Sequence, residues 1–85
     1  MKLKVQPHVA WQMVGTEAVV MDLASGRTVG FNPTGSFIWS RLAAGDDHGL
    51  VEAFAARFHV SNEAATSDVA AFLAYLVEQN LVAPA

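Results

Sequence analysis

The apolar positions of this chain change their spacing near residue 32. Residues 9–14 (VAWQMV) and 27–31 (RTVGF) alternate loosely, which is typical of strands with one buried face. From residue 37 onward, apolar side chains recur at every third or fourth position, which indicates amphipathic helices. The chain therefore divides into an extended half and a helical half.

Residues 18–23 (AVVMDL) predict a strand between the other two. Apolar and β-branched side chains fall on both of its faces up to Asp22, which is typical of a central strand covered on both sides or nearly so. Residues 15–17 (GTE) and 24–26 (ASG) provide short turns. Short connections between successive strands favour an antiparallel meander of three.

The first helix is predicted to begin directly after the third strand. Asn32 is a good N-cap, and Pro33 suits the first helical position because its missing N–H needs no partner there. Gly45 is expected to end this helix. Its apolar face would consist of Phe37, Ile38, Trp39 and Leu42.

Two more helices are predicted in the rest of the chain. Asp46 or Asp47 is expected to cap the second, which carries apolar side chains at Leu50, Val51, Phe54, Ala55 and Phe58. Ser61 is expected to cap the third, which would extend to Asn80 with an apolar stripe at Ala65, Val69, Phe72, Leu73, Leu76 and Val77. The predicted fold is α+β: a three-stranded antiparallel meander followed by three helices, which is winged-helix-like.

Composition points to one domain that meets a partner. Eighty-five residues predict a single domain over residues 1–85. The chain is 53% hydrophobic and only 15% charged, which is apolar for a protein with so much surface per residue. Some of the apolar residues are therefore expected to contact a partner rather than the core.

Charge argues against nucleic acid as that partner. The net charge is −3, and only 5 residues are Lys or Arg. Proteins that bind nucleic acids usually carry a basic patch. Residues 61–82, which hold the expected third helix, contain neither Lys nor Arg.

Candidate chemistry is scarce, so we expect a protein that is not an enzyme and has no metal or cofactor. His8, His48 and His59 are far apart, and there is no cysteine, which fits a cytoplasmic protein. No serine stands in a GxSxG motif, and the glycines form no phosphate-binding loop. No apolar run is long enough to span a membrane.

The third predicted strand lies at the edge of the meander, where its backbone N–H and C=O groups lack partners. Proteins usually protect such edges with charge or proline, and neither occurs from Thr28 to Phe31. Gly30 also removes a side chain from the outward face, which lets another backbone approach. An extended peptide could add here as a fourth strand. The pattern alone leaves two alternatives open: two copies pair through this edge, or the N-terminal tail covers it.

A series of motifs runs through residues 19–82 in one order. An apolar pair precedes Asp22, Gly26 lies in the turn, NPTG occupies residues 32–35, Ile-Trp follows at 38–39, DVAAFLAYL occupies 68–76, and Leu81 comes last. This order resembles the PqqD family, although Phe31 stands where the family usually has leucine.

The resemblance implies a carrier for peptides, built as a RiPP recognition element with a cleft between its third strand and third helix. In the family, the leader of a ribosomally made precursor peptide adds to that strand, and the carrier presents the peptide to a modifying enzyme, such as a radical SAM protein. The residues that would contact the leader are Arg27, Thr28, Val29, Gly30 and Phe31 on the strand, and Asp68, Phe72, Tyr75, Leu76 and Gln79 on the helix.

Each of these side chains has a structural alternative. Phe72 and Leu76 lie on the apolar stripe and are equally well explained as core. Tyr75 lies off the stripe, which favours contact with a ligand. Asp68 and Arg27 fit solvated positions, although Arg27 could pair with an acidic leader residue. Two other functions stay open: a winged-helix-like regulatory domain, and a self-association module that forms a homodimer through the same edge.

Overall fold

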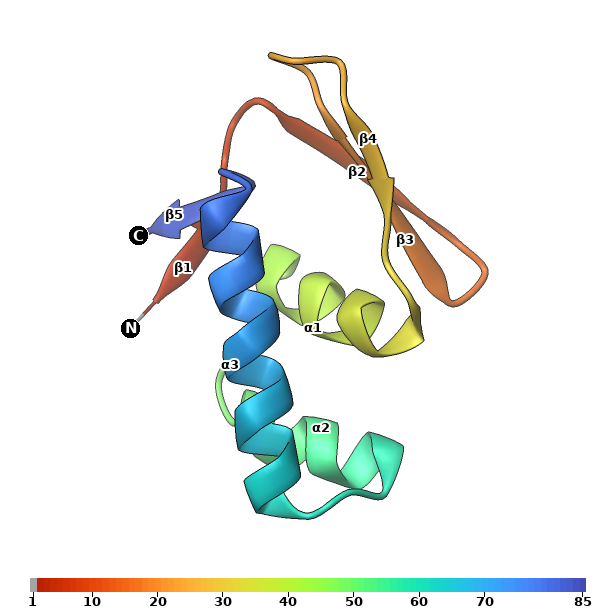
Figure 1. Cartoon of the computed structure of the whole chain (residues 1–85), viewed down its shortest axis with the longest axis vertical. Coiled ribbons are helices and arrows are strands. Elements are labelled where there is room, and N and C mark those ends of the chain that lie inside the picture. Colours follow the sequence, from red (N-terminus) through yellow and green to blue (C-terminus); the bar gives the residue numbers. More distant parts are fainter. Residues whose placement is uncertain (1) are drawn as a thin grey trace.

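The computed structural model describes residues 2–85 and contains two small sheets and three helices, arranged as in Figure 1. The larger sheet is an antiparallel meander with strand order β2-β3-β4. Its strands are β2 (Val9–Val14), β3 (Glu17–Asp22) and β4 (Thr28–Gly30). The helices follow as α1 (Pro33–Ala43), α2 (Leu50–Phe58) and α3 (Asn62–Glu78). The predicted α+β arrangement is confirmed.

A second sheet, which was not predicted, joins the two ends of the described chain. β1 (Leu3–Val5) pairs antiparallel with β5 (Val82–Pro84), so that Leu3 lies opposite Pro84. Three-residue strands are too short to show a period, so the spacing of apolar residues does not predict this pair. The N-terminal segment therefore lies away from β4, against the alternative that it covers that strand's edge.

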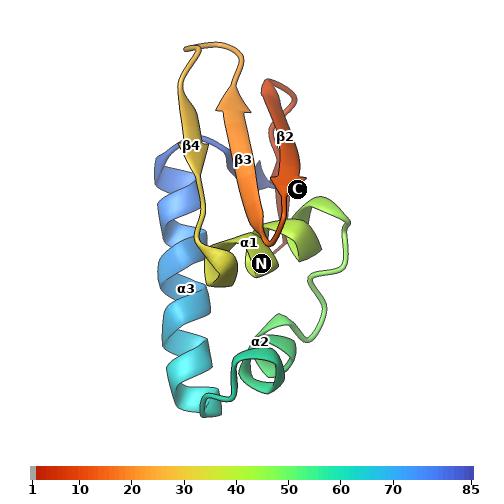
Figure 2. The same ribbon diagram turned by 90° about the vertical axis from the view of Figure 1, so that its right-hand side faces the viewer.

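The larger sheet is covered on one face only. Trp11, Val20 and Val29 lie in one row across the inner face, which packs against α1. Ala18 and Val20 are fully buried there, whereas Met21 on the opposite face is 42% exposed. The prediction that the central strand is covered on both sides is wrong, because the helices lie on one side of this sheet (Figure 2). Its apolar outer face is open.

The core has two parts that share a boundary on α3. One part lies under the sheet and contains the fully buried Trp39 together with Phe31. The other lies between the helices around Ile38 and Phe54. Phe72 and Leu73 pack against both parts, so α3 links the sheet half of the molecule to the helical half.

The start of α2 differs from the prediction. The N-cap is Gly49, which has φ 65, and neither Asp46 nor Asp47 caps the helix. The guanidinium group of Arg41 donates to the carbonyl oxygens of Asp46 at 3.1 Å and His48 at 3.4 Å. These bonds hold the loop in a non-helical conformation, so the helix begins later than the acidic pair suggests. The N-caps Asn32 and Ser61 are as predicted.

A serine hydroxyl joins the sheet to α1. Ser36 is 1% exposed, accepts a hydrogen bond from the Ala18 N–H at 2.7 Å and donates one to the Phe31 carbonyl at 3.2 Å. Phe31 N–H still donates to the Ala18 carbonyl at 3.0 Å. Ser36 thus takes the place of one hydrogen bond of the β3–β4 ladder, at the point where the chain leaves the sheet and enters the helix.

We expect Ser36→Ala to destabilise the fold, because it leaves the Ala18 N–H and the Phe31 carbonyl buried without this partner. An unsatisfied buried group costs about 1–3 kcal/mol. For a domain of this size the melting temperature would fall by about 4–8 °C for each kcal/mol, measured by circular dichroism. Ser40→Ala, in the same helix, is the control, since its hydroxyl only approaches the Met13 sulfur at 3.5 Å. Equal melting temperatures for the two variants would contradict this role.

Candidate functional site

The free edge of β4 is the first component of the candidate site. β4 pairs with β3 on one side and with no other strand among residues 2–85. Figure 2 shows β4 as the strand of the sheet on the side of α3, with β2 on the far side. An edge strand presents backbone donors and acceptors that can pair with another chain.

The register fixes which backbone groups point outward. The Asp22 N–H donates to the Arg27 carbonyl at 2.8 Å, and the Phe31 N–H donates to the Ala18 carbonyl. In an antiparallel ladder every second residue faces the neighbouring strand, so Arg27, Val29 and Phe31 face β3. The outward N–H and C=O groups therefore belong to Thr28 and Gly30. The expectation that the whole backbone from 27 to 31 is available is wrong for the three inward-facing residues.

The turn before β4 holds this edge in place. The Asp22 carboxylate accepts hydrogen bonds from the backbone N–H groups of Ala24 at 2.9 Å and Ser25 at 3.2 Å. Desolvation alone would raise the pKa of Asp22, but these two bonds and the nearby His8 ring outweigh it and hold the pKa below its ordinary value. The aspartate is thus charged at neutral pH, and its hydrogen bonds stabilise the turn between β3 and β4.

A depression of about 330 Å³ forms the second component, near the end of β4. It is lined by the N-terminal part of α1, by Phe54 of α2, and by one side of α3: Asn32, Thr34, Gly35, Ile38, Phe54, Asp68, Ala71, Phe72 and Tyr75. The structure thus brings three of the predicted helix residues (Asp68, Phe72 and Tyr75) together in one place. Its size, at the lower limit of ligand pockets, suits a side chain better than a separate small molecule.

Aromatic rings connect the strand to this depression. Phe31 packs edge-on against Phe72, with ring centroids 5.1 Å apart, and against Tyr75 at 6.5 Å. Tyr75 is 38% exposed, whereas Phe31 is buried at 6%. The buried Phe31 side chain therefore fills the space between β4 and α3. Tyr75 is the more exposed ring, which an incoming chain could contact.

Gly35 allows α1 and α3 to approach each other at this depression. A Cβ atom at Gly35 would lie 2.8 Å from Phe72 Cε1 and 3.0 Å from Cζ, which is closer than packed atoms come. In the sequence, Gly35 is only one residue of the NPTG motif at the start of the first helix. Its real contact is with an aromatic residue 37 positions later, and no local pattern predicts such a contact.

Two predicted helix residues do not lie at this surface. Leu76 is fully buried in the core under the sheet, so its predicted contact with a ligand is wrong and the alternative of a core residue is correct. Gln79 is the C-cap of α3, where its backbone N–H donates to the Tyr75 carbonyl, and it does not line the depression. Sequence reasoning missed Thr34, Ile38 and Phe54 as lining residues, since only the fold brings α1 and α2 to this side of α3.

Asp68 is the one acidic residue among the side chains that line the depression. Its carboxylate forms no ion pair with any residue from 2 to 85. The side chain is exposed on α3, beside the apolar surfaces of Ala71 and Phe72. It would favour a cationic group of a ligand at this place.

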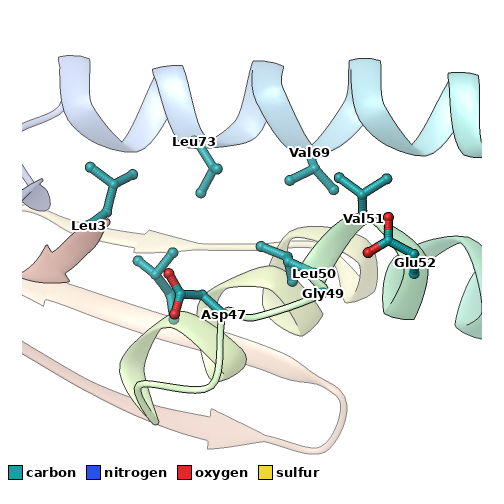
Figure 3. Close-up of a pocket in the computed structure, with 9 residues that line it drawn as sticks. Leu3, Asp47, Gly49, Leu50, Val51, Glu52, Val69 and Leu73 are labelled. Atoms are coloured by element: carbon teal, nitrogen blue, oxygen red, sulfur yellow. The ribbon is translucent and has the colours of Figure 1, made fainter. Parts of the chain in front are cut away.

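A second depression, of about 300 Å³, lies between α3 and the segment that links α1 to α2 (Figure 3). Its walls include Leu50, Val69 and Leu73, with the carboxylates of Asp47 and Glu52 at the rim. Within residues 2–85, no group of three or more His, Asp or Glu side chains could hold a metal ion. None of the described helices is long and apolar enough to cross a membrane.

Comparison with known families decides the classification. The profile of the family described as "Coenzyme PQQ synthesis protein D (PqqD)" matches residues 17–82. The chain belongs to this family. The match begins at β3 and ends in β5, so it includes β4, all three helices and every residue of the candidate site.

Two solved structures are similar to this PqqD-family chain. One, described as "TbiB1 in Complex with the TbiA(beta) Leader Peptide", has 29% sequence identity and a TM-score of 0.86, with 93% of each chain covered. The other, described as "Lasso peptide synthetase B1 complexed with the leader peptide", has 22% identity and a TM-score of 0.87, and it covers 99% of this chain and 100% of its own. At that identity the second likeness concerns the fold alone. No curated protein matches this chain.

We expect the change Gly35→Ala to push the Phe72 ring aside, because the new methyl group would overlap it. Overpacking of this kind costs about 1–3 kcal/mol. Phe72→Leu should relieve the overlap, so the double variant should be more stable than the sum of the two single changes predicts. Chemical denaturation of all four proteins measures this coupling. Strict additivity would show that Gly35 has another role.

Proposed function

We propose that this protein binds the leader of a ribosomally made precursor peptide as an added strand on β4, and that residues 1–85 act as one peptide-binding unit. The observation that carries the proposal is the free edge at Thr28 and Gly30 beside a depression lined by Asp68, Phe72 and Tyr75. Family membership and the similar structure of TbiB1, a leader-peptide complex, support it.

The geometry suits a disordered peptide better than a folded partner. Thr28 and Gly30 offer two N–H and two C=O groups, so a guest strand gains backbone hydrogen bonds whatever its sequence. Alternate side chains of that strand point to the inner face, where the depression provides an apolar surface and a carboxylate. A disordered chain loses conformational entropy when it binds, so affinity depends on these few anchors.

The protein itself would perform no reaction in this role. Its effect would be to hold the peptide and raise the local concentration of the modifiable segment beside an enzyme that changes peptides, such as a radical SAM protein. Cytoplasmic peptide synthesis would supply the substrate, and the cytoplasmic location stays a prediction. The winged-helix alternative is weaker, since α3 carries no Lys or Arg that could contact phosphates.

The change Thr28→Pro should weaken peptide binding about tenfold, because it removes an outward N–H and leaves a guest carbonyl without its partner. The fold should survive, since proline is tolerated on an edge strand where its nitrogen faces solvent. The probe is a 12-residue peptide selected on the intact protein from a phage-displayed random library, with affinity measured by fluorescence anisotropy.

Thr28→Val is the matched control, because it changes the same side chain and keeps the N–H. Amide chemical shifts should move at β4 and along α3 when the peptide binds the wild-type protein. Binding that shifts only other regions, or that is equal in both variants, would refute strand addition. A concentration-dependent dimer with β4 amides already protected from exchange would favour self-association instead.

A separate prediction concerns the charge of Asp68. Selected peptides should be enriched in Lys or Arg near their centre, and Asp68→Asn should reduce their affinity by roughly two- to fivefold, as for an exposed charge pair. The loss should shrink as salt is added, since salt screens exposed charges. Asp47→Asn, at the rim of the second depression, is the control. If Asp68→Asn and Asp47→Asn lowered peptide affinity equally, the loss would be due to the net charge of the protein alone, and a specific role of Asp68 would be refuted.

A further inference from the structure

Gly30 is the one glycine that the fold does not explain. Of the six glycines in the chain, Gly15, Gly26, Gly45 and Gly49 have positive φ angles, which disfavour other residues. Gly35 has no room for a Cβ atom beside Phe72. Gly30 has neither constraint: its φ is not positive, and a Cβ atom there would meet nothing within 4 Å.

A glycine within a strand is normally unfavourable. It loses more backbone entropy on folding than other residues and offers no side chain for packing. Strand addition does not require it either, although the sequence predicts that Gly30 lets another backbone approach: side chains project from the faces of a sheet, while hydrogen bonds form at its edge. The missing side chain at residue 30 therefore needs an explanation on the outer face of the sheet.

The outer face around Gly30 is apolar and open. The register places Gln12, Val19 and Gly30 in one row and Ala10, Met21 and Thr28 in the next. Val19 is half-buried, and Met21 is 42% exposed. Neither row contains a charged residue. With no side chain on Gly30, the flank of Val19 stays accessible from the free edge of β4.

We propose that the bound peptide carries an aromatic residue beside Gly30, with its ring lying across the bare backbone of Gly30 against Val19 and Met21. This inference rests on the proposed strand addition and adds a second subsite to it. Strands lie about 4.8 Å apart, so a guest side chain must reach across about two strand spacings to contact Val19. A ring can extend over a glycine in this way, as aromatic residues do when they cover glycines in neighbouring strands.

The subsite is on the opposite face of the sheet from the depression. Neighbouring residues of a strand point to opposite faces, so the aromatic residue and the residue that enters the depression are an odd number of positions apart in the guest. The protein would then contact side chains on both faces of the bound peptide strand. The outer contact uses β3 and β4, and the inner contact uses α1 and α3.

The test compares Gly30→Val with Thr28→Val on the full chain. Both variants carry a valine on the same outer face, keep every backbone N–H and favour strand structure, but only Gly30→Val adds a side chain where there was none. Gly30→Val should leave the melting temperature unchanged or raise it, and should weaken the binding of library-selected peptides about fivefold or more. Thr28→Val should change affinity less than twofold.

A second measurement isolates the ring. For one selected peptide, NMR contacts identify the residue that lies beside Gly30, and that residue is changed to alanine. On the wild-type protein this change should lower affinity roughly fivefold, and on Gly30→Val it should have little further effect.

The possible failures are distinguishable. One outcome is that selected peptides change the chemical shifts of the β4 amides, show no preference for an aromatic residue beside Gly30, and bind Gly30→Val with the wild-type affinity. This outcome would overturn the outer subsite but would leave strand addition supported. Peptides that bind away from β4, or no selected peptides at all, would overturn both. If Gly30→Val unfolds the protein, the glycine is structural and the inference is wrong.

Discussion

The hydrogen bonds of one buried hydroxyl group determine how the two halves of this protein meet. Ser36 sits between the Ala18 N–H and the Phe31 carbonyl, in the place where the β3–β4 ladder would otherwise continue. The sheet can therefore end and α1 can begin while the Ala18 N–H and the Phe31 carbonyl both keep a hydrogen-bond partner. Because the helix starts at this point, the C-terminal end of β4, the first turn of α1 and the middle of α3 converge.

The candidate site is a consequence of that convergence. Phe31 turns under the sheet and contacts both Trp39 and Phe72, which ties the strand to two helices at once. Gly35 lets α1 approach the Phe72 ring, and the same close approach leaves the depression beside Tyr75. Core packing and the proposed peptide contact would thus share side chains here, so a change at Phe72 would alter both. Thr28, Gly30 and Asp68 are separate from the core and can be changed without that difficulty.

Local patterns predicted the elements well where the elements were long or capped. Residues 9–14 form a strand with the predicted bounds, and Asn32 and Ser61 cap helices because their side chains bond within three residues. The start of α2 was missed because Arg41, from another helix, holds the preceding loop. The β1–β5 pair was missed because its partners are separated by nearly the whole chain.

The site was predictable only in part for the same reason. The unprotected strand and the resemblance of the motifs led to β4 and α3, but spacing could not separate the buried Leu76 from the accessible Tyr75. The register of β4 against β3 decides which backbone groups of β4 face outward. That register depends on hydrogen bonds to β3, which the amino-acid composition does not predict. The sequence did not predict that the outer face of the sheet is open, because residues 18–21 of the central strand are apolar on both faces.

The pairing of β1 with β5 gives the polypeptide the topology of a nearly closed ring, with Leu3 and Pro84 as neighbours. A short linker could join these ends, and new termini could be opened in the exposed loop before Gly49 without cutting a strand or a helix. In such a circularly permuted protein the free edge of β4 would keep its neighbours, while an attached enzyme or reporter would emerge from the opposite part of the molecule.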